Sequence, residues 1–477
     1  MRYKAGEDKK QISLFPASLD DYVPADHICR VINAFTEQLD MSALGYKYAE
    51  VKSTGCRPYD PRMMLNLYIY GYLHRIRSSR RLQCETSRNV EVMWLMDGLR
   101  PDDKTICNFR KDNSKALRET FREFSKMWRE LGLYGGELVA TDSTKFRANN
   151  SRKNNHNKIV VDNEIGRLEK RISEYMNALE EGDKEDELEK APDSEQIKTA
   201  LERLKSRKNK FESLRTQLQS EREVSTVDPD ARRMRSGGDA REFDICYNVH
   251  TVVDSKNQLI VDFAVSNCAS DAGNLKSMSQ KAMDILDVKS LTNLADAGYY
   301  DSQDIAACEG SGVTCFVAKG KVGGSKKAEG FNRHDFIYDR ENDLYRCPCN
   351  QELRFKSYRK HISGRKYRIY SNTPACTRCE KKSLCTTYRY REVLRLTCQD
   401  VLDVVDERTA VNKALYRKRR EIVEHPFGTI KAVWGFKQFL CRTLPKVTGE
   451  TALAYMAYNL RRVINISREK GLNLAWH

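Results

Sequence analysis

Two short apolar segments that each end in an aspartate constrain the fold of this chain more than any other feature. They are "ELVATD", residues 137–142, and "LTNLAD", residues 291–296. Between them, "FDICYNVHTVVD" and "QLIVDFAVS" flank a polar turn at residues 255–257 and predict two hairpin strands, followed by an amphipathic helix. A further helix and the strand "TCFVAK" come after the second aspartate. This order of strands and helices predicts an α/β fold.

The ends of the two segments point to a metal site. Acids at the ends of neighbouring strands, here Asp142 and Asp296, can approach each other closely in a twisted sheet. A third acid, Glu424, lies within the basic segment "YRKRREIVEHPFGTIK", residues 416–431. Three carboxylates form a set of hard oxygen ligands that suits Mg²⁺ or Mn²⁺. Two such ions would activate a water and stabilise both oxygens of an in-line phosphoryl displacement.

Each acid also has an ordinary interpretation. An aspartate at the end of a strand is most often a turn residue or a helix cap. The basic segment around Glu424 is consistent with a solvated helix that carries charge pairs between residues three or four apart. The ordered combination of all three acids in one chain favours the metal site over these alternatives.

Composition limits the kind of partner and the compartment. The chain has 477 residues, which favours two to four domains, and a formal net charge of +16, which favours a polyanionic partner. Its apolar segments are shorter than the roughly 18 residues that a membrane-spanning helix needs. Fifteen cysteines in a long chain without a secretion signal predict reduced thiols and a cytoplasmic protein.

The first 130 residues predict a helical region. Asp60 and Pro61 form a helix start, with the aspartate as cap and the proline in the first turn. Further on, an apolar helix, a turn at residues 98–101 and a short helix from about Thr105 that carries Arg110 and Lys111 give the outline of a helix-turn-helix DNA reader. A plain helical bundle is the alternative.

Two insertions interrupt the α/β pattern. Residues 161–220 are strongly charged but keep apolar residues three or four apart, which predicts an antiparallel coiled-coil hairpin around an acidic linker that contains Pro192. The second insertion, residues 319–407, holds a cluster of cysteines. The spacing predicts a structural Zn²⁺ site, with Cys349 competing for one position and reduced thiols or disulfides as the alternatives. The expected ligands are Cys347, Cys376, Cys379 and Cys385.

The sequences around the three acids resemble the DDE transposases of bacterial insertion sequences. The first aspartate lies in "ATDSTK" and the second in "ADAGYYDS", which is similar to the family's AD-x-GY turn. The family signature of Tyr, two residues, Arg, three residues, Glu, six residues and Lys fits Arg420, Glu424 and Lys431, whereas Tyr416 lies one residue too far upstream. "EHPFGTIK" with the following "WGF", and "SLDDYVPADH" near the start, extend the resemblance over nearly the whole chain apart from the charged hairpin.

The resemblance implies an RNase H-like catalytic core with a mixed five-stranded sheet, and it divides the chain into five parts. They are a helical DNA-binding domain at 1–130, the first parts of the core at 131–158 and 224–319, the coiled-coil hairpin at 159–223, a Cys-rich zinc-ribbon-like insertion at 320–407, and the last part of the core at 408–477.

The resemblance also implies an activity and its partners. Asp142, Asp296 and Glu424 would coordinate two Mg²⁺ or Mn²⁺ ions. A metal-bound water would cut the end of the element, and the freed 3′-hydroxyl would attack target DNA. The implied partners are double-stranded DNA, as transposon ends and target, and a second copy of the chain in a homodimer that pairs the two ends, with no membrane. The residues expected to contact DNA are Tyr416, Arg419, Arg420, Lys431, Lys145, Arg110 and Lys111.

Two other functions remain open from the sequence. An enzyme of the same fold that only hydrolyses DNA, without joining ends, would use the same carboxylates. A catalytically silent relative that binds DNA as a repressor or structural factor would not need them. The presence of all three acids favours an active enzyme over the silent relative.

Overall fold

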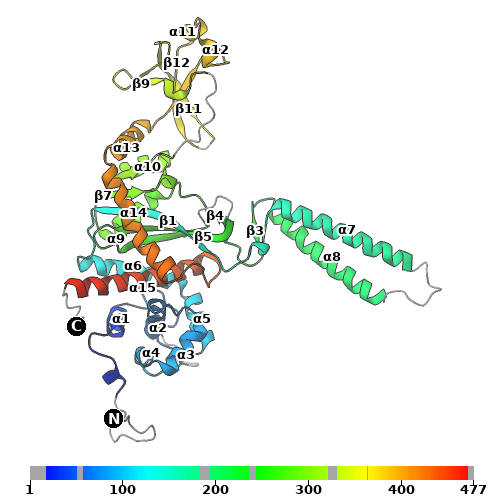
Figure 1. Ribbon diagram of the computed structural model, residues 1–477, viewed down its shortest axis with the longest axis vertical. Coiled ribbons are helices and arrows are strands. Elements are labelled where there is room, and N and C mark those ends of the chain that lie inside the picture. Colours follow the sequence, from blue (N-terminus) through cyan, green and yellow to red (C-terminus); the bar gives the residue numbers. More distant parts are fainter. Residues whose placement is uncertain are drawn as a thin grey trace, which may run out of the picture.

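The computed structural model describes residues 18–50, 57–182, 194–235, 243–320, 330–362 and 364–470. A central sheet lies between a helical N-terminal region and a small second sheet, and a pair of long helices projects from its side (Figure 1). Within these described residues, no helix is both long and apolar enough to cross a bilayer.

The N-terminal region is helical, as its apolar spacing predicts. The Asp60 carboxylate accepts the Arg62 N–H and caps the second helix, with Pro61 at its first position. The fifth helix starts at Asp103, two residues before the expected Thr105, because the Asp102 side chain caps it. The elements are η1 (Leu19–Tyr22), α1 (Ile28–Glu37), α2 (Pro61–Leu73), α3 (Ser79–Arg88), α4 (Val90–Leu95), α5 (Asp103–Asp112) and α6 (Ser114–Glu130).

The central sheet is mixed and has six strands rather than the expected five, because a short strand, β4, also pairs with β5. The order is β4-β5-β1-β7-β8, with β6 paired to β5. β1 is antiparallel to β5 and parallel to β7, β7 is parallel to β8, and β6 is antiparallel to β5. The strands are β1 (Leu138–Arg147), β4 (Arg232–Arg235), β5 (Phe243–Asp254), β6 (Ile260–Ser266), β7 (Leu291–Ala295) and β8 (Val313–Val317).

Helices cover the central sheet and connect it to the N-terminal region. The longest of them, α15, packs against α6, α2 and β6, so the N-terminal helices and the sheet share one hydrophobic core. Another, α14, crosses the sheet and contacts β1, β5 and β7 (Figure 1). These elements are α9 (Leu275–Leu286), η3 (Ala297–Tyr299), α10 (Ser302–Glu309), α13 (Gln399–Val411), α14 (Lys413–Phe427), the π-helix η5 (Gly428–Val433) and α15 (Leu444–Lys470).

The projecting arm consists of α7 (Lys158–Gly182) and α8 (Ser194–Gln217), which run side by side (Figure 1). At its base, η2 (Arg152–Asn154) leads into β2 (Asn155–His156), which pairs with β3 (Val224–Ser225). Apolar residues of both helices form a small core of their own near this base. The acidic linker with Pro192, expected between the helices, lies outside the described residues.

The cysteine-rich segment forms a separate antiparallel sheet in the order β13-β12-β11-β10-β9. Its core consists of five apolar and aromatic residues: Phe336, Tyr345, Leu353, Tyr370 and Val393. The elements are η4 (Arg333–Asp335), β9 (Ile337–Asp339), β10 (Leu344–Arg346), β11 (Glu352–Lys360), β12 (Lys366–Ser371), α11 (Thr373–Thr377), α12 (Lys382–Cys385) and β13 (Glu392–Leu396).

Candidate active site

Asp142 and Asp296 lie side by side on two neighbouring parallel strands. The register of β1 and β7 pairs Thr141 with Ala295, and each aspartate is the next residue along its strand. Asp296 follows the end of β7, as the sequence predicts. Asp142, by contrast, is inside β1, because pairing with β5 extends that strand to Arg147. Asp142 therefore marks the point where β7 stops pairing with β1, and not the end of a strand.

One guanidinium contacts both carboxylates. The Arg419 Nη1 lies 2.8 Å from Asp142 Oδ2, and its Nη2 lies 3.2 Å from Asp296 Oδ1. The Arg419 side chain is only 11% exposed, so these ion pairs are partly shielded from water. Because a guanidinium is compact and planar, the two acids must converge on a shared region that holds a cation.

Burial raises the pKa of Asp142. Desolvation raises the pKa of Asp142 to about 6, and the neighbouring carboxylates of Asp296 and Asp271 push in the same direction. Arg419 and the Ser143 N–H, which lies 2.7 Å from Asp142 Oδ1, oppose this rise. Partly buried acids that repel each other are stabilised by added positive charge, so this pair fits a divalent cation.

Glu424 lies on the same helix as Arg419, one and a half turns further along. Five residues of α-helix correspond to about 7.5 Å along the axis. The helix is fixed to the sheet on both sides of Glu424, by the Tyr416 hydroxyl on the Ala295 carbonyl at 3.1 Å and by the Lys431 ammonium on the Lys145 carbonyl at 2.7 Å. Glu424 is exposed, and no contact among the described residues joins its carboxylate to the two aspartates.

Two family models match parts of the chain. One, described as "Transposase domain (DUF772)", matches residues 17–112, and the other, described as "Transposase DDE domain", matches residues 346–464. No curated protein and no solved structure gives a significant match. The two matches support an insertion-sequence DDE transposase. The second match includes Glu424 and the cysteine cluster, whereas Asp142 and Asp296 lie outside both matches.

The other basic residues expected near the acids differ in their exposure to solvent. Arg420 is exposed four residues before Glu424, so the two share one flank of α14, and Arg420 has no ion pair within the described parts of the chain. Lys431 is instead turned towards β1, where its ammonium lies 4.6 Å from the centre of the Phe146 ring. Burial lowers the pKa of Lys431 to about 8. Lys145 is half-buried on β1.

A break in helix geometry directs Lys431 to the sheet. Pro426 lies inside α14 and lacks the N–H that would continue the regular hydrogen bonding. The chain goes on as the π-helix η5, which carries Lys431. π-helical turns commonly occur at functional positions. Here the turn brings Lys431 onto the strand that also holds Asp142.

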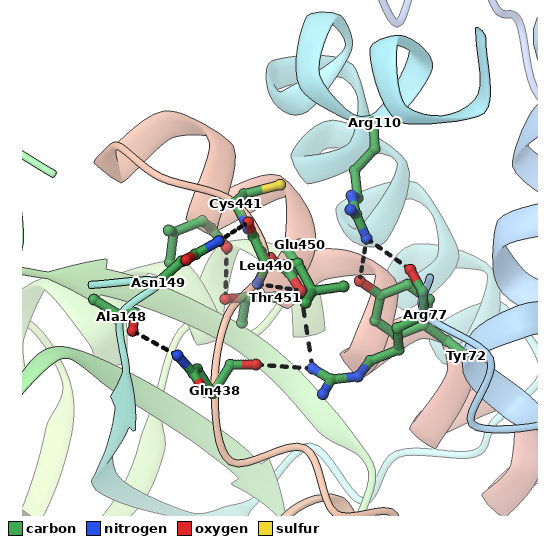
Figure 2. A network of polar contacts seen from close by, with 11 residues as sticks. Tyr72, Arg77, Arg110, Ala148, Asn149, Gln438, Leu440, Cys441, Glu450 and Thr451 are labelled. Carbon is green, nitrogen blue, oxygen red and sulfur yellow. Dashed lines mark hydrogen bonds and ion pairs between the residues drawn. The ribbon is translucent and has the colours of Figure 1, made fainter. Parts of the chain in front are cut away.

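Two residues expected to contact DNA, Tyr416 and Arg110, form hydrogen bonds within the protein. The Tyr416 hydroxyl donates to the Ala295 carbonyl and is half-buried, which raises its pKa. Arg110 is only 5% exposed, and its Nη1 lies 3.4 Å from the Tyr72 hydroxyl and 3.2 Å from the Arg77 carbonyl (Figure 2). Its guanidinium is enclosed between α5 and α2, which does not favour the expected contact of Arg110 with DNA. Its neighbour Lys111 is exposed.

One acid beside the site, Asp271, is not among the residues that the sequence singles out. Asp271 accepts a hydrogen bond from Asn248 at 2.8 Å and lies 3.8 Å from the buried His250 ring. A Cβ on Gly298 would lie 2.9 Å from Asp271 Oδ2, so the glycine of the AD-x-GY turn lets this carboxylate approach. Its position in "SNCASDAGN", between a strand and a helix, was the available signal.

Five of the six cysteines in the cysteine-rich insertion, all except Cys398, line one small cavity of about 30 Å³. The sulfurs of Cys349 and Cys379 are 3.8 Å apart, and the Gln351 N–H donates to the Cys347 sulfur at 3.3 Å. Burial and the neighbouring Cys379 raise the pKa of Cys349. The structure thus groups Cys349 with the four cysteines that the sequence favours: Cys347, Cys376, Cys379 and Cys385.

A second group of ligand-type residues is accounted for by packing. Ligand atoms of His27, Cys29 and Glu91 lie within 4.8 Å of one another. His27 caps α1 through the Cys29 N–H and lies 3.4 Å from Glu91, which also accepts the Tyr70 hydroxyl at 2.5 Å. Burial raises the pKa of the Cys29 thiol to about 12. These contacts join α1, α2 and α4, and we assign no metal to them.

Proposed function

We propose that this transposase binds the terminal inverted repeats of an insertion sequence, cleaves the ends by metal-dependent hydrolysis and joins the 3′-hydroxyl to target DNA. The observation that carries the proposal is the contact of one guanidinium with Asp142 and Asp296 on adjacent parallel strands. The strand order supports an RNase H-like core, with three antiparallel pairs (β1 with β5, and β5 with both β4 and β6) on one side and two parallel pairs (β1 with β7, and β7 with β8) on the other.

Asp142, Asp296 and Glu424 would hold two Mg²⁺ or Mn²⁺ ions. When bound, these ions would supply the activation of a water or 3′-hydroxyl and the stabilisation of the displaced oxygen. Glu424 is exposed on the helix that covers the site, so it is free to turn towards the aspartates. Asp271 lies behind the aspartates and would keep the surrounding field negative.

The basic residues of α14 would bind the DNA backbone. Arg420 is exposed beside Glu424 and would neutralise a phosphate next to the reacting one. When metal ions bind the two aspartates, the Arg419 guanidinium would no longer be needed to neutralise them. It would then leave the carboxylates and form an ion pair with a phosphate of the DNA. Lys145, Lys111 and Lys431 would contribute further backbone contacts, and Tyr416 would hold α14 on the sheet.

We infer the five-part division of the chain that the sequence predicts, a homodimer that pairs two DNA ends, a cytoplasmic location, and a structural Zn²⁺ in the cysteine-rich insertion. The five grouped thiols support the zinc, because thiolates are its usual structural ligands. A closed site of this kind would stiffen the insertion and take no part in cleavage.

Nicking of supercoiled plasmid tests the proposed activity. Asp142→Asn keeps the shape of the side chain but removes the charge that would hold the metal, so we expect Mg²⁺-dependent nicking to fall by about 10³-fold or more. Gel electrophoresis of the purified proteins measures the rate.

Asp284→Asn is the matched control, since Asp284 is an exposed aspartate on α9. It should nick at the wild-type rate. An Asp142→Asn protein that nicks as fast as the wild type would refute the assignment. A strand-transfer assay with a pre-cut end then separates a transposase from a nuclease that does not join ends.

A further inference from the structure

A groove of about 670 Å³ lies at the base of the projecting arm, away from the carboxylates. One wall comes from α7 and α8, the other from β4 and β5, and β2 with its preceding turn forms the floor. Five basic residues and two glutamates line it, a formal difference of +3. The basic residues are Arg152, Lys153, Arg207, Arg222 and Arg233.

The acids of the groove already have partners, whereas several cations do not. Glu164 pairs with Arg207 at 2.7 Å. Glu223 accepts the Asn155 amide at 2.7 Å and a backbone N–H of β4 at 3.1 Å. Lys153 and Arg222 are exposed, and their side chains form no ion pair with any residue that the structure describes. Lys153 and Arg222 are therefore available to an outside anion.

Aromatic rings lie among these cations. The Arg233 guanidinium lies 4.7 Å from the centre of the Phe243 ring, which presents it at the groove wall. Phe211 of α8 faces the same space. Packing on a ring limits the motion of the guanidinium, and a row of fixed cations favours a polyanion such as nucleic acid over a free inorganic ion.

The groove and the aspartates are connected through β1. Arg147, at the end of this strand, and Arg152, at the groove, both pair with Asp244, at 2.8 and 2.9 Å. The five residues from Asp142 to Arg147 span about 17 Å at the rise of an extended strand. That length corresponds to roughly five nucleotide steps along one strand of DNA. A duplex at the carboxylates would thus need about half a helical turn to reach the groove.

We propose that this groove binds the phosphate backbone of the DNA duplex beside the segment at the aspartates. The inference rests on the proposed function, because it assumes that DNA occupies the active site. The contact is independent of sequence, since exposed Lys and Arg side chains recognise phosphates and not base edges. It positions the substrate and takes no part in the chemistry.

The test is the salt dependence of DNA binding. A fluorescein-labelled duplex of random sequence, about 30 base pairs long, is titrated with the full chain without divalent ions at about 50 to 200 mM salt. Lys153→Gln/Arg222→Gln removes two phosphate contacts, so the slope of log K against log[salt] should flatten by about 1.8. Fluorescence anisotropy gives the binding constants, and thermal unfolding checks that the variant is folded.

Lys170→Gln/Arg171→Gln is the matched control, because it removes the same charge from exposed positions on α7 outside the groove. Its slope should equal that of the wild type. Equal slopes in all three proteins, or equal losses in both variants, would overturn the proposal. A loss of binding to polyglutamate with no change for the duplex would overturn it too, by identifying an acidic protein as the occupant.

The experiments test DNA binding by the groove and the proposed nicking activity independently. Asp142→Asn should leave the salt slope unchanged while removing nicking. If the groove variant keeps the wild-type slope and Asp142→Asn still removes nicking, the groove assignment is wrong and the transposase chemistry stands. If Asp142→Asn nicks normally and the groove variant flattens the slope, the groove binds DNA in a protein of different activity.

Discussion

Arg419 neutralises the two aspartates of the candidate site in this structure. The sequence marked it as one of several cations on a basic helix, without any preference over its neighbours Arg417, Lys418 and Arg420. In the fold, it alone among these four reaches both aspartates. It occupies the region between two carboxylates that a divalent cation would also occupy. Metal binding and the Arg419 ion pairs should therefore compete.

Arg419→Gln tests this competition. Without the guanidinium, the two carboxylates lose their positive partner, and we expect Mn²⁺ to bind about tenfold more tightly in the absence of DNA. The pKa of Asp142 should rise further in the variant, because the Ser143 N–H is then left to oppose burial and repulsion without Arg419, so titrations belong at about pH 8. Electron paramagnetic resonance of free Mn²⁺ measures the affinity directly.

Arg420→Gln serves as the control for the loss of one positive charge, since Arg420 lies next to Arg419 but does not touch the aspartates. It should change Mn²⁺ affinity much less. An Arg419→Gln protein that binds Mn²⁺ no better than Arg420→Gln would show that the guanidinium does not compete with the metal.

At the scale of elements, the cysteine-rich insertion has a hydrophobic core too small to stabilise its sheet alone. Its core comprises five buried apolar and aromatic residues under a five-stranded sheet. Small domains with so little core usually need an additional cross-link. The thiols collect at one end of the sheet, where β10 leads into β11 and where α11 and α12 follow β12. A Zn²⁺ ion coordinated by these thiolates would cross-link the loops.

Elemental analysis of protein purified under reducing conditions tests the zinc. We expect about one Zn²⁺ per chain, and its loss in Cys379→Ser, because Cys379 belongs to the C-x2-C pair and also contacts Cys349. Cys268→Ser is the control, since Cys268 is an exposed cysteine outside the cluster. Zinc near zero in the wild type, or full zinc in Cys379→Ser, would contradict the site.

At the scale of the whole molecule, a buried glutamate joins the N-terminal helices to the loop beside the central sheet. Glu450 of α15 is fully buried and accepts the backbone N–H groups of Leu440 and Cys441 at 2.9 and 2.8 Å (Figure 2). Arg77, from the connection between α2 and α3, lies 3.9 Å from the same carboxylate and donates to the Gln438 carbonyl at 2.9 Å. The loop after η5 is thus held from both regions.

Glu450→Ala should destabilise the protein by about 2–4 kcal/mol, because it leaves two partly buried backbone N–H groups without acceptors and Arg77 without its buried carboxylate. Urea unfolding followed by tryptophan fluorescence measures the loss. Glu469→Ala, an exposed position on the same helix, should change the free energy of unfolding by less than about 0.5 kcal/mol. Similar losses in both variants would argue against a specific role for Glu450.

Local patterns in the sequence were enough to predict the N-terminal helices, the main strands of the central sheet, the helical arm and the positions of the first two acids. Apolar segments of strand length, alternating with amphipathic helices, indicate strands and helices because local spacing controls which side chains can be buried together. Asp142 and Asp296 stand out for the same reason, since each follows an apolar segment directly. The helical N-terminal region and the cap at Asp60 were equally accessible from local pattern.

Which charges meet depends on tertiary packing. Arg110 and Arg420 both look like surface cations in the sequence, yet one is enclosed between helices and the other is exposed. Asp271 joins the site because β5, η3 and its own loop meet behind the aspartates. Contacts of this kind connect residues more than a hundred positions apart, as for Arg419 and Asp142. Local sequence sets the conformation of each segment, but the packing of several segments at once sets the partners of a charge.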